Sequence, residues 1–184
     1  MYQKIENIIF MKYGVHASED VELIIKRKIA EIQQCKKMFW GYGGVLCHPL
    51  NQVQPFLKSN ALKNQKTHLV MTKTLSKLNN TPSAATMYSV DNINWCPIPN
   101  NVRVLGSKYA IVCNSITQCE FILDLADYVI PLGNCKGRRL SQYIQGRVDK
   151  ACGYYQINTA KNISMPVIIT LCAEIESPFS VFIK

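Results

Sequence analysis

The order of the strand-forming segments constrains the fold of this 184-residue chain more than any other feature. From position 67 to position 132, apolar runs rich in β-branched and aromatic residues follow one another, separated by short stretches of Asn, Pro, Ser and Gly. Strands that succeed each other directly pair antiparallel through turns, whereas a doubly wound parallel sheet needs a helix between successive strands. We therefore expect an α+β fold with a mainly antiparallel sheet of about eight short strands and two helices.

Turn signals divide the strand-like segments. Asp91-Asn92 predicts a turn between two short strands, and Gly106-Ser107 predicts the two-residue loop of a hairpin. Ser177-Pro178 predicts that the C-terminal run forms two strands, and a kink is expected near Ala126. The strand-like segments lie at 7–16, 39–47, 67–74, 87–99, 102–113, 119–132 and 165–184.

Two segments have apolar residues at helical spacing. The first begins at Ser18, a suitable N-cap with acidic residues after it, and extends to Met38. Its expected apolar side consists of Leu23, Ile24, Ile25, Ile29, Ile32 and Cys35. The second helix is expected over Arg138–Tyr155, in the C-terminal third of the chain. Its expected apolar stripe consists of Leu140, Ile144, Val148 and Ala151.

Composition indicates a single folded domain over residues 1–184. Hydrophobic residues make up 48% of the chain, which is enough for a core. No apolar run is long enough to cross a bilayer, and the apolar patch near the N-terminus is too short for a secretory signal. The eight cysteines are scattered and form no C-x-x-C pair, which indicates reduced thiols and no zinc site. We expect a cytoplasmic protein without a membrane partner, a metal or a cofactor.

The chain is basic, with a net charge of +9, and its acidic residues are unevenly distributed. No Asp or Glu occurs between Glu31 and Asp91, or between Asp127 and Asp149, and both intervals contain several basic residues. Intervals of this kind attract polyanions and accelerate their binding. The charge pattern therefore favours nucleic acid or a nucleotide as the partner.

The second acid-free interval predicts an anion site. A loop containing Gly133 and Gly137 leads into the expected helix, so backbone N–H groups and the helix N-terminus would face a phosphate. Arginine would add bidentate contacts, although no P-loop or G-x-G-x-x-G sequence occurs. The predicted ligand-binding residues are Lys136, Arg138, Arg139, Tyr143 and Arg147.

The first acid-free interval contains the sequence FWGYGG. Trp40 and Tyr42 are two residues apart and so share one face of a strand, with Phe39 on the other face. Exposed aromatic residues on strands stack on bases, and glycines admit a ligand or another backbone. The segment predicts either a base-stacking surface formed by Trp40 and Tyr42 or a packed core strand.

The segment CHPLNQVQPF follows and is interpreted as a loop. His48, Asn51 and Gln52 are candidates for hydrogen bonds to the edge of a ligand. His48 is also a candidate catalytic acid or base, ahead of His16 and His68.

Glu174 and Glu176 are two residues apart on a predicted strand, so both carboxylates lie on one face. This Glu-x-Glu pattern resembles the catalytic motif of mono-ADP-ribosyltransferases. The resemblance implies a small, mainly β fold that binds NAD, and it makes Glu174 and Glu176 candidate catalytic residues.

The leading hypothesis is a binding protein for a phosphate-rich ligand, nucleic acid before nucleotide, that uses the basic loop-helix and the aromatic-glycine strand. One alternative is an NAD- or nucleotide-processing enzyme, similar to ADP-ribosyltransferases, that acts through His48 or Glu176. Another is a protein-interaction module, such as an inhibitor that blocks a nucleic-acid-binding partner.

Overall fold

A computed structural model describes residues 1–14, 20–42, 50–74, 83–106, 108–144, 151–156 and 163–184. These residues form a ten-stranded sheet, two α-helices and two 3₁₀ segments. The helices are α1 (Val21–Cys35) and α2 (Leu50–Leu62), and the 3₁₀ segments are η1 (Leu125–Asp127) and η2 (Leu140–Tyr143). The strands are β1 (Asn7–Tyr13), β2 (Met38–Tyr42), β3 (His68–Lys73), β4 (Met87–Ser89), β5 (Cys96–Pro97), β6 (Tyr109–Cys113), β7 (Thr117–Asp124), β8 (Tyr128–Val129), β9 (Ala151–Tyr155) and β10 (Pro166–Ile183).

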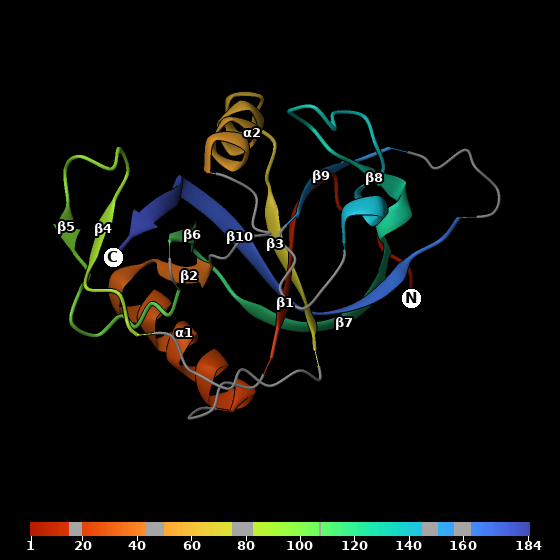
Figure 1. The fold of residues 1–184 in the computed structure, drawn as a ribbon. Coiled ribbons are helices and arrows are strands. Elements are labelled where there is room, and N and C mark those ends of the chain that lie inside the picture. Colours follow the sequence, from red (N-terminus) through yellow and green to blue (C-terminus); the bar gives the residue numbers. More distant parts are fainter. Residues whose placement is uncertain (15–19, 43–49, 75–82, 107, 145–150, 157–162) are drawn as a thin grey trace.

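Strand β10 lies at the centre of the sheet (Figure 1). It pairs antiparallel with β7, β3, β6 and β4, and the main path through the sheet runs β2-β6-β10-β3-β1-β9-β8. Among the pairs of named strands, β1 with β3 is the parallel one. The predicted α+β class with a mainly antiparallel sheet is confirmed, with ten strands among the described residues in place of about eight.

Residues 165–184 contain one long bent strand where the sequence predicts two. The register between β10 and β6 shifts between Ile175 and Ser180. The Gln54 side chain of α2 holds this bend, because its amide donates to the Pro178 carbonyl at 3.0 Å. Its oxygen accepts from the backbone N–H and the hydroxyl of Ser180, at 3.2 and 2.7 Å. The side chain of Gln54 therefore hydrogen-bonds to backbone groups where the sheet register is interrupted.

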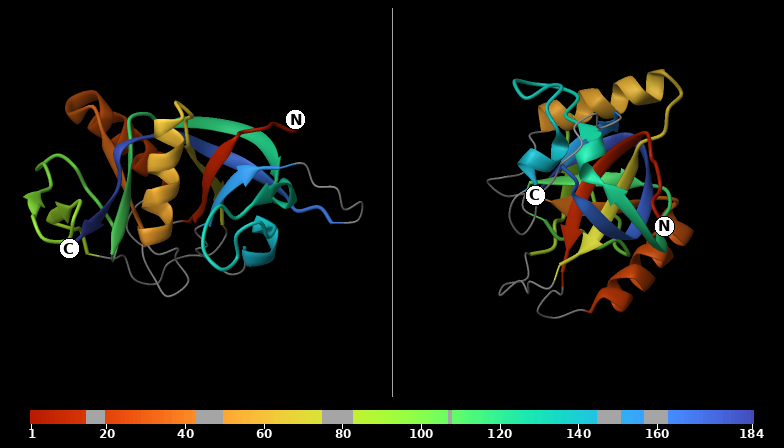
Figure 2. Two further views of the ribbon diagram at one scale, coloured as in Figure 1. Left: turned by 90° about the horizontal axis from the view of Figure 1, so that it is seen from above. Right: turned by 90° about the vertical axis from the view of Figure 1, so that its right-hand side faces the viewer.

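Figure 2 shows the helices and the 3₁₀ segments arranged around the sheet. Apolar side chains form a core on each face of the sheet. The central core lies between the sheet and the two helices and includes Ile9, Leu69, Met71, Leu171, Ile25, Val53, Phe56 and Leu57. The opposite core packs the other face of β1, β3 and β10 against the segment around η1 and η2, through Ile8, Phe10, Val70, Leu123, Tyr128, Leu140 and Ile144. A third core beneath β4 includes Phe39, Val104, Ala110, Val112 and Val181.

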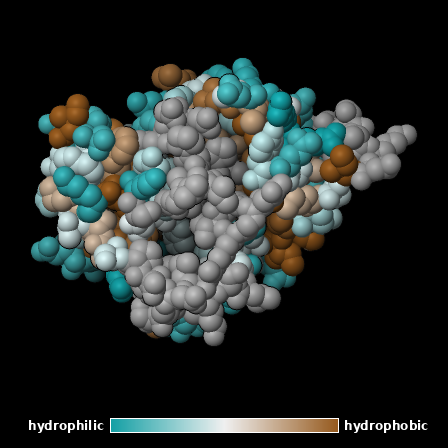
Figure 3. Space-filling model, viewed as in Figure 1, coloured by the Kyte–Doolittle hydropathy of each residue, from teal (hydrophilic) through white to brown (hydrophobic). Residues whose placement is uncertain are grey.

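The surface carries both hydrophilic and apolar residues. On the side shown in Figure 3, hydrophilic residues cover much of the described surface, and apolar residues form small separate groups. Within the described ranges, neither helix combines the length and the apolar character that a membrane span requires.

Helix α1 is capped by Asp20, whose carboxylate accepts from the Leu23 N–H at 2.9 Å. The predicted cap, Ser18, lies outside the described residues. The buried side of α1 differs from the predicted apolar stripe, because Leu23 and Ile29 are 51% and 40% exposed. Two charged residues, Lys28 and Glu31, are buried instead.

Lys28 and Glu31 form a buried ion pair with 3.0 Å between Nζ and Oε2. The Lys28 ammonium also donates to the carbonyl oxygens of Phe39 and Arg103, at 2.7 and 2.8 Å, and Glu31 accepts from the Arg103 N–H at 3.0 Å. Burial lowers the pKa of Lys28 to about 8, although the Glu31 carboxylate opposes the shift. These contacts tie α1 to β2 and to the chain at Arg103, which accounts for the buried charges on a face predicted to be apolar.

The prediction of a helix over Arg138–Tyr155 is wrong. In the described part of this range, the short η2 forms near the start and Ala151–Tyr155 is the strand β9, while residues 145–150, with Val148, lie outside the described residues. Leu140 and Ile144 are buried in the opposite core, so their apolar spacing does mark an inward face. However, β9 pairs with β1 and β8, and this non-local backbone pairing overrides the local helical pattern.

The second helix is α2, in a region where the sequence predicts a loop. Its inward side is formed by Val53, Phe56 and Leu57, and Pro55 lies within it on the exposed side. Prolines and amides around a short apolar group obscure the helical spacing in this segment.

The prediction of a hairpin over 102–113 is also wrong, since β6 pairs with β2 and β10 and residues 102–104 are not a strand. Ser107, in the predicted turn, lies outside the described residues. Gly106 packs against Gly41 of β2. A Cβ on Gly41 would overlap the Leu105 carbonyl oxygen, and a Cβ on Gly106 would lie 2.8 Å from the Tyr42 nitrogen. Because Gly41 has no side chain, the backbone of Leu105 and Gly106 can lie close to β2.

We predict that Gly41→Ala destabilises the fold by about 3 kcal/mol, because the added methyl group overlaps backbone that cannot move independently. Urea unfolding at equilibrium measures the change.

Gly137→Ala is the control. Gly137 has a φ of +81° and open space around it, so alanine there brings backbone strain of about 1 kcal/mol without a clash. Equal losses for the two variants would contradict the packing explanation for Gly41.

Candidate functional site

The aromatic residues of β2 belong mainly to the core. Trp40 and Tyr42 lie on the central-core face and Phe39 on the face of the third core, as their spacing predicts. Tyr42 is 4% exposed and packs against Tyr109 with ring centroids 5.4 Å apart. Trp40 is half-buried and meets the Tyr13 ring edge-on at 6.5 Å. Of the two predicted stacking residues, Trp40 is therefore the more exposed and Tyr42 belongs to the core.

The basic loop before η2 differs from the predicted anion site. The backbone N–H groups of Lys136, Gly137 and Arg138 donate to carbonyl oxygens within the loop, at 2.9 to 3.1 Å. The expected helix N-terminus is missing because η2 spans four residues. Arg138 is exposed and donates to the Tyr143 hydroxyl at 3.0 Å, and Arg139 is half-buried beside β8. These three amides are therefore already bonded within the loop and are not free for an anion, whereas the side chains of Lys136 and Arg138 are exposed.

The predicted site residues are not brought together in the described structure. Trp40 lies on β2, at one end of the main sheet path, and Arg139 bridges to β8 at the other end. His48 and Arg147 lie outside the described residues. Asn51 and Gln52 lie in the first turn of α2, where the structure describes the backbone alone.

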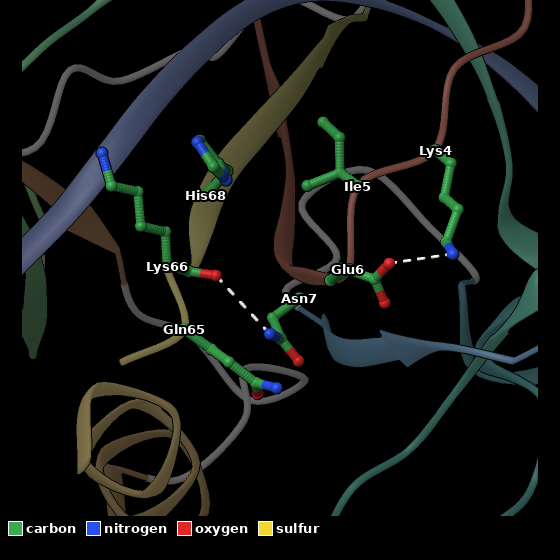
Figure 4. A pocket seen from close by; sticks show the side chains of 7 residues that line it. All are labelled: Lys4, Ile5, Glu6, Asn7, Gln65, Lys66 and His68. Carbon is green, nitrogen blue, oxygen red and sulfur yellow. Dashed lines mark hydrogen bonds and ion pairs between the residues drawn. The ribbon is translucent and has the colours of Figure 1, made fainter. Parts of the chain in front are cut away.

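A cavity of about 310 Å³ opens elsewhere, between the N-terminal segment and the start of β3 (Figure 4). Its lining consists of Lys4, Ile5, Glu6, Asn7, Gln65, Lys66 and His68. The chain leaves α2 through residues 63–66 and enters β3 at His68, so the segment that joins α2 to β3 forms one wall. The volume is at the lower end of the range for small-molecule sites.

His68 and Glu174 lie directly opposite each other on the antiparallel strands β3 and β10. The Glu174 carboxylate pairs with the Lys66 ammonium at 3.1 Å. The His68 Nδ1 is buried and has no hydrogen-bond partner among the described residues. Burial lowers the pKa of His68; Glu174 opposes this shift and Lys66 adds to it, so the imidazole is neutral at pH 7.

The opposite wall is fixed by the side chain of Tyr128. Its hydroxyl donates to the Ile5 carbonyl at 2.8 Å and accepts from the Ile5 N–H at 3.2 Å. Next to Ile5, the Lys4 ammonium pairs with Glu6 at 2.8 Å and lies 4.6 Å from the centre of the Tyr155 ring. Tyr128 therefore anchors the backbone that presents Lys4 and Glu6 to the cavity.

The cavity collects hydrogen-bond donors of several kinds. Two ammonium groups, an imidazole and the amides of Asn7 and Gln65 line it, and the two carboxylates beside it are paired with lysines. Glu174 and Glu176 of β10 are not lining residues, but Glu174 contacts the lining through its ion pair with Lys66. Among the described residues, no group of three or more His, Cys, Asp or Glu side chains could hold a metal ion. The arrangement suits a polar anion.

The sequence signal for this site is weak. His68 ranks below His48 in the sequence, and the acid-free interval includes Lys66 without distinguishing it from other lysines. Lys4, Glu6, Asn7 and Gln65 carry no motif, since only the pairing of β3 with β1 and β10 assembles them around His68.

We predict that Tyr128→Phe destabilises the protein by about 2 kcal/mol, because the Ile5 N–H and carbonyl both lose their partner. Thermal unfolding measures the loss, and faster amide hydrogen exchange at Ile5 localises it to the cavity wall.

Tyr143→Phe is the matched control, since it removes a hydroxyl that contacts Arg138 at the surface. Its expected effect is about 0.5 kcal/mol or less. Unchanged exchange at Ile5 in Tyr128→Phe would show that the tyrosine does not anchor this wall.

Comparisons with protein-family models, with curated proteins and with solved structures find no match to this chain, so a function is proposed from the geometry of the site alone.

Proposed function

We propose that this chain binds a phosphate-rich ligand, nucleic acid first and nucleotide second, at the cavity and the lysine-bearing end of α2 beside it. The observation that carries the proposal is the position of the cavity next to the basic segment 50–67. Residues 50–67 contain no Asp or Glu, and Lys58, Lys63 and Lys66 are exposed there. Such a surface attracts a phosphate backbone by releasing its counterions.

The end of α2 leads directly to the cavity. The Gln65 N–H donates to the Asn60 carbonyl at 2.8 Å, which folds residues 63–65 back onto the helix. Gln65 and Lys66 then line the cavity. A ligand whose phosphates contact Lys58 and Lys63 can therefore extend into the cavity, where the exposed amide of Gln65 can bind the edge of a base or sugar.

This proposal keeps the class of ligand expected from the charge pattern and changes the place where it binds. Trp40 is packed against Tyr13, and the backbone N–H groups of Lys136, Gly137 and Arg138 are bonded within their loop. Lys58 of α2 and Lys63 and Lys66 just after it belong to the longer acid-free interval, and their side chains are exposed.

We predict that the protein binds an oligonucleotide with an affinity that falls steeply as salt increases, and that Lys58→Ala/Lys63→Ala weakens this binding. Each lost phosphate contact to a single strand reduces the slope of log K against log salt by about 0.7. Fluorescence anisotropy at several salt concentrations measures both quantities.

Lys26→Ala/Lys108→Ala is the charge-matched control, because both lysines are exposed and lie outside residues 50–67. It should leave the slope unchanged, and Lys136→Ala/Arg138→Ala tests the basic loop in the same assay. Absence of binding at low salt, or the same slope for every variant, would refute the proposed surface.

The second candidate is an enzyme that processes NAD or another nucleotide. It is favoured by the position of Glu174 opposite His68 at the cavity, where a carboxylate and a neutral imidazole can both accept a proton. Transfer of label from NAD by the wild type, lost in Glu174→Gln and retained in Glu176→Gln, would support the enzyme. No transfer by the wild type would remove this candidate.

A further inference from the structure

We infer that the cavity receives a terminal phosphate monoester, so that the chain selects phosphorylated ends of nucleic acid, or free nucleotides, over internal phosphodiesters. This inference rests on the proposed function and specifies the part of the ligand that enters the cavity.

The donors of the cavity are held in ion pairs that an anion can replace. The side chains of Lys4 and Glu6 are 53% and 66% exposed, and that of Lys66 is 68% exposed. Exposed ion pairs contribute little to stability, so both ammonium groups can turn from a carboxylate to a ligand at small cost. Figure 4 shows Lys66 and His68 extending to one side of the cavity, with Lys4 and Glu6 on the other side.

The number of charges favours a monoester over a diester. A phosphate monoester carries between −1.5 and −2 charges at about pH 7 and has three acceptor oxygens, whereas an internal phosphodiester carries a single charge. Lys4 and Lys66 both line the cavity, and an ammonium group that turns from its carboxylate can contact an oxygen of a dianion. A cavity of about 310 Å³ is also large enough to hold an end group such as a phosphate with its sugar.

His68 supplies a donor without adding a charge. A hydrogen on Nδ1 would be buried without an acceptor among the described residues, so the neutral ring carries its hydrogen on Nε2. The ring lines the cavity, and Nε2 is the nitrogen left to bind a ligand. A phosphate oxygen between Lys66 and His68 would accept hydrogen bonds from both.

Glu174 reduces the affinity of the cavity for an anion. Its carboxylate holds the Lys66 ammonium and repels an incoming anion. Replacing Glu174 by Gln keeps the shape of the side chain and removes both effects. The variant should therefore bind a phosphorylated end more tightly than the wild type, which a purely structural role for Glu174 would not produce.

The test compares three oligonucleotides of one sequence, which carry a 5′-phosphate, a 3′-phosphate or hydroxyl groups at both ends. We expect one phosphorylated end to bind about tenfold more tightly than the hydroxyl form, as for one added charge-assisted hydrogen bond. Competition by a mononucleotide and by inorganic phosphate distinguishes recognition of the nucleotide end from recognition of phosphate alone.

Variants assign the preference to the cavity. Lys66→Ala should abolish it, Glu174→Gln should increase it about threefold, and Glu176→Gln should leave it unchanged. His68→Gln, which retains a donor, should keep more of the preference than His68→Ala. Circular dichroism confirms that each variant is folded.

Equal binding of the three oligonucleotides by the wild type, with the salt dependence intact, would overturn this inference and leave the proposed function standing. Absence of binding to every oligonucleotide at low salt would overturn both. A Glu174→Gln variant that binds the phosphorylated end more weakly than the wild type would also overturn the inference.

Discussion

The pairing of β10 with four other strands is the interaction on which the rest of the structure depends. The first half of β10 pairs with β7 and β3, and its last residues pair with β6 and β4. Strand β10 therefore connects the part of the sheet that packs against η1 and η2 with the part that packs against α1. Because β10 pairs with strands that are distant in the sequence, such as β3, the fold is rich in long-range contacts.

The pairing of β10 with its neighbours positions both the bend in this strand and the residues around the cavity. Gln54 of α2 binds the backbone at Pro178 and Ser180, where the register shifts. A few residues before the bend, Glu174 lies beside His68. The inward side of α2 and its Gln54 support the strand, and the segment that follows the helix supplies a wall of the cavity through Gln65 and Lys66.

The elements that could be predicted from sequence are those with strong local signals. The strand β3 follows a clear β-branched and apolar run, and Asp91 forms the turn between β4 and β5, where its carboxylate accepts from the N–H groups of Ile93 and Asn94. The elements that were missed have competing signals. Residues 151–155 continue a helical apolar pattern yet pair as β9, and the buried Lys28–Glu31 pair occupies a face of α1 that looks apolar in the sequence. Most of the proposed site was missed because Lys4, Asn7 and Gln65 belong to no motif.

The sequence alone determined the fold class and the basic, carboxylate-free character of residues 32–90, because composition and local periodicity are properties of neighbouring residues. It also determined that Trp40 and Tyr42 share a face, since side chains alternate along any strand. Only the tertiary structure decided which basic residues meet which carboxylates. Lys66 and Glu174 are 108 positions apart, and they meet because β3 lies next to β10. The choice of strand neighbours depends on the packing of the whole sheet, so no local pattern specifies it.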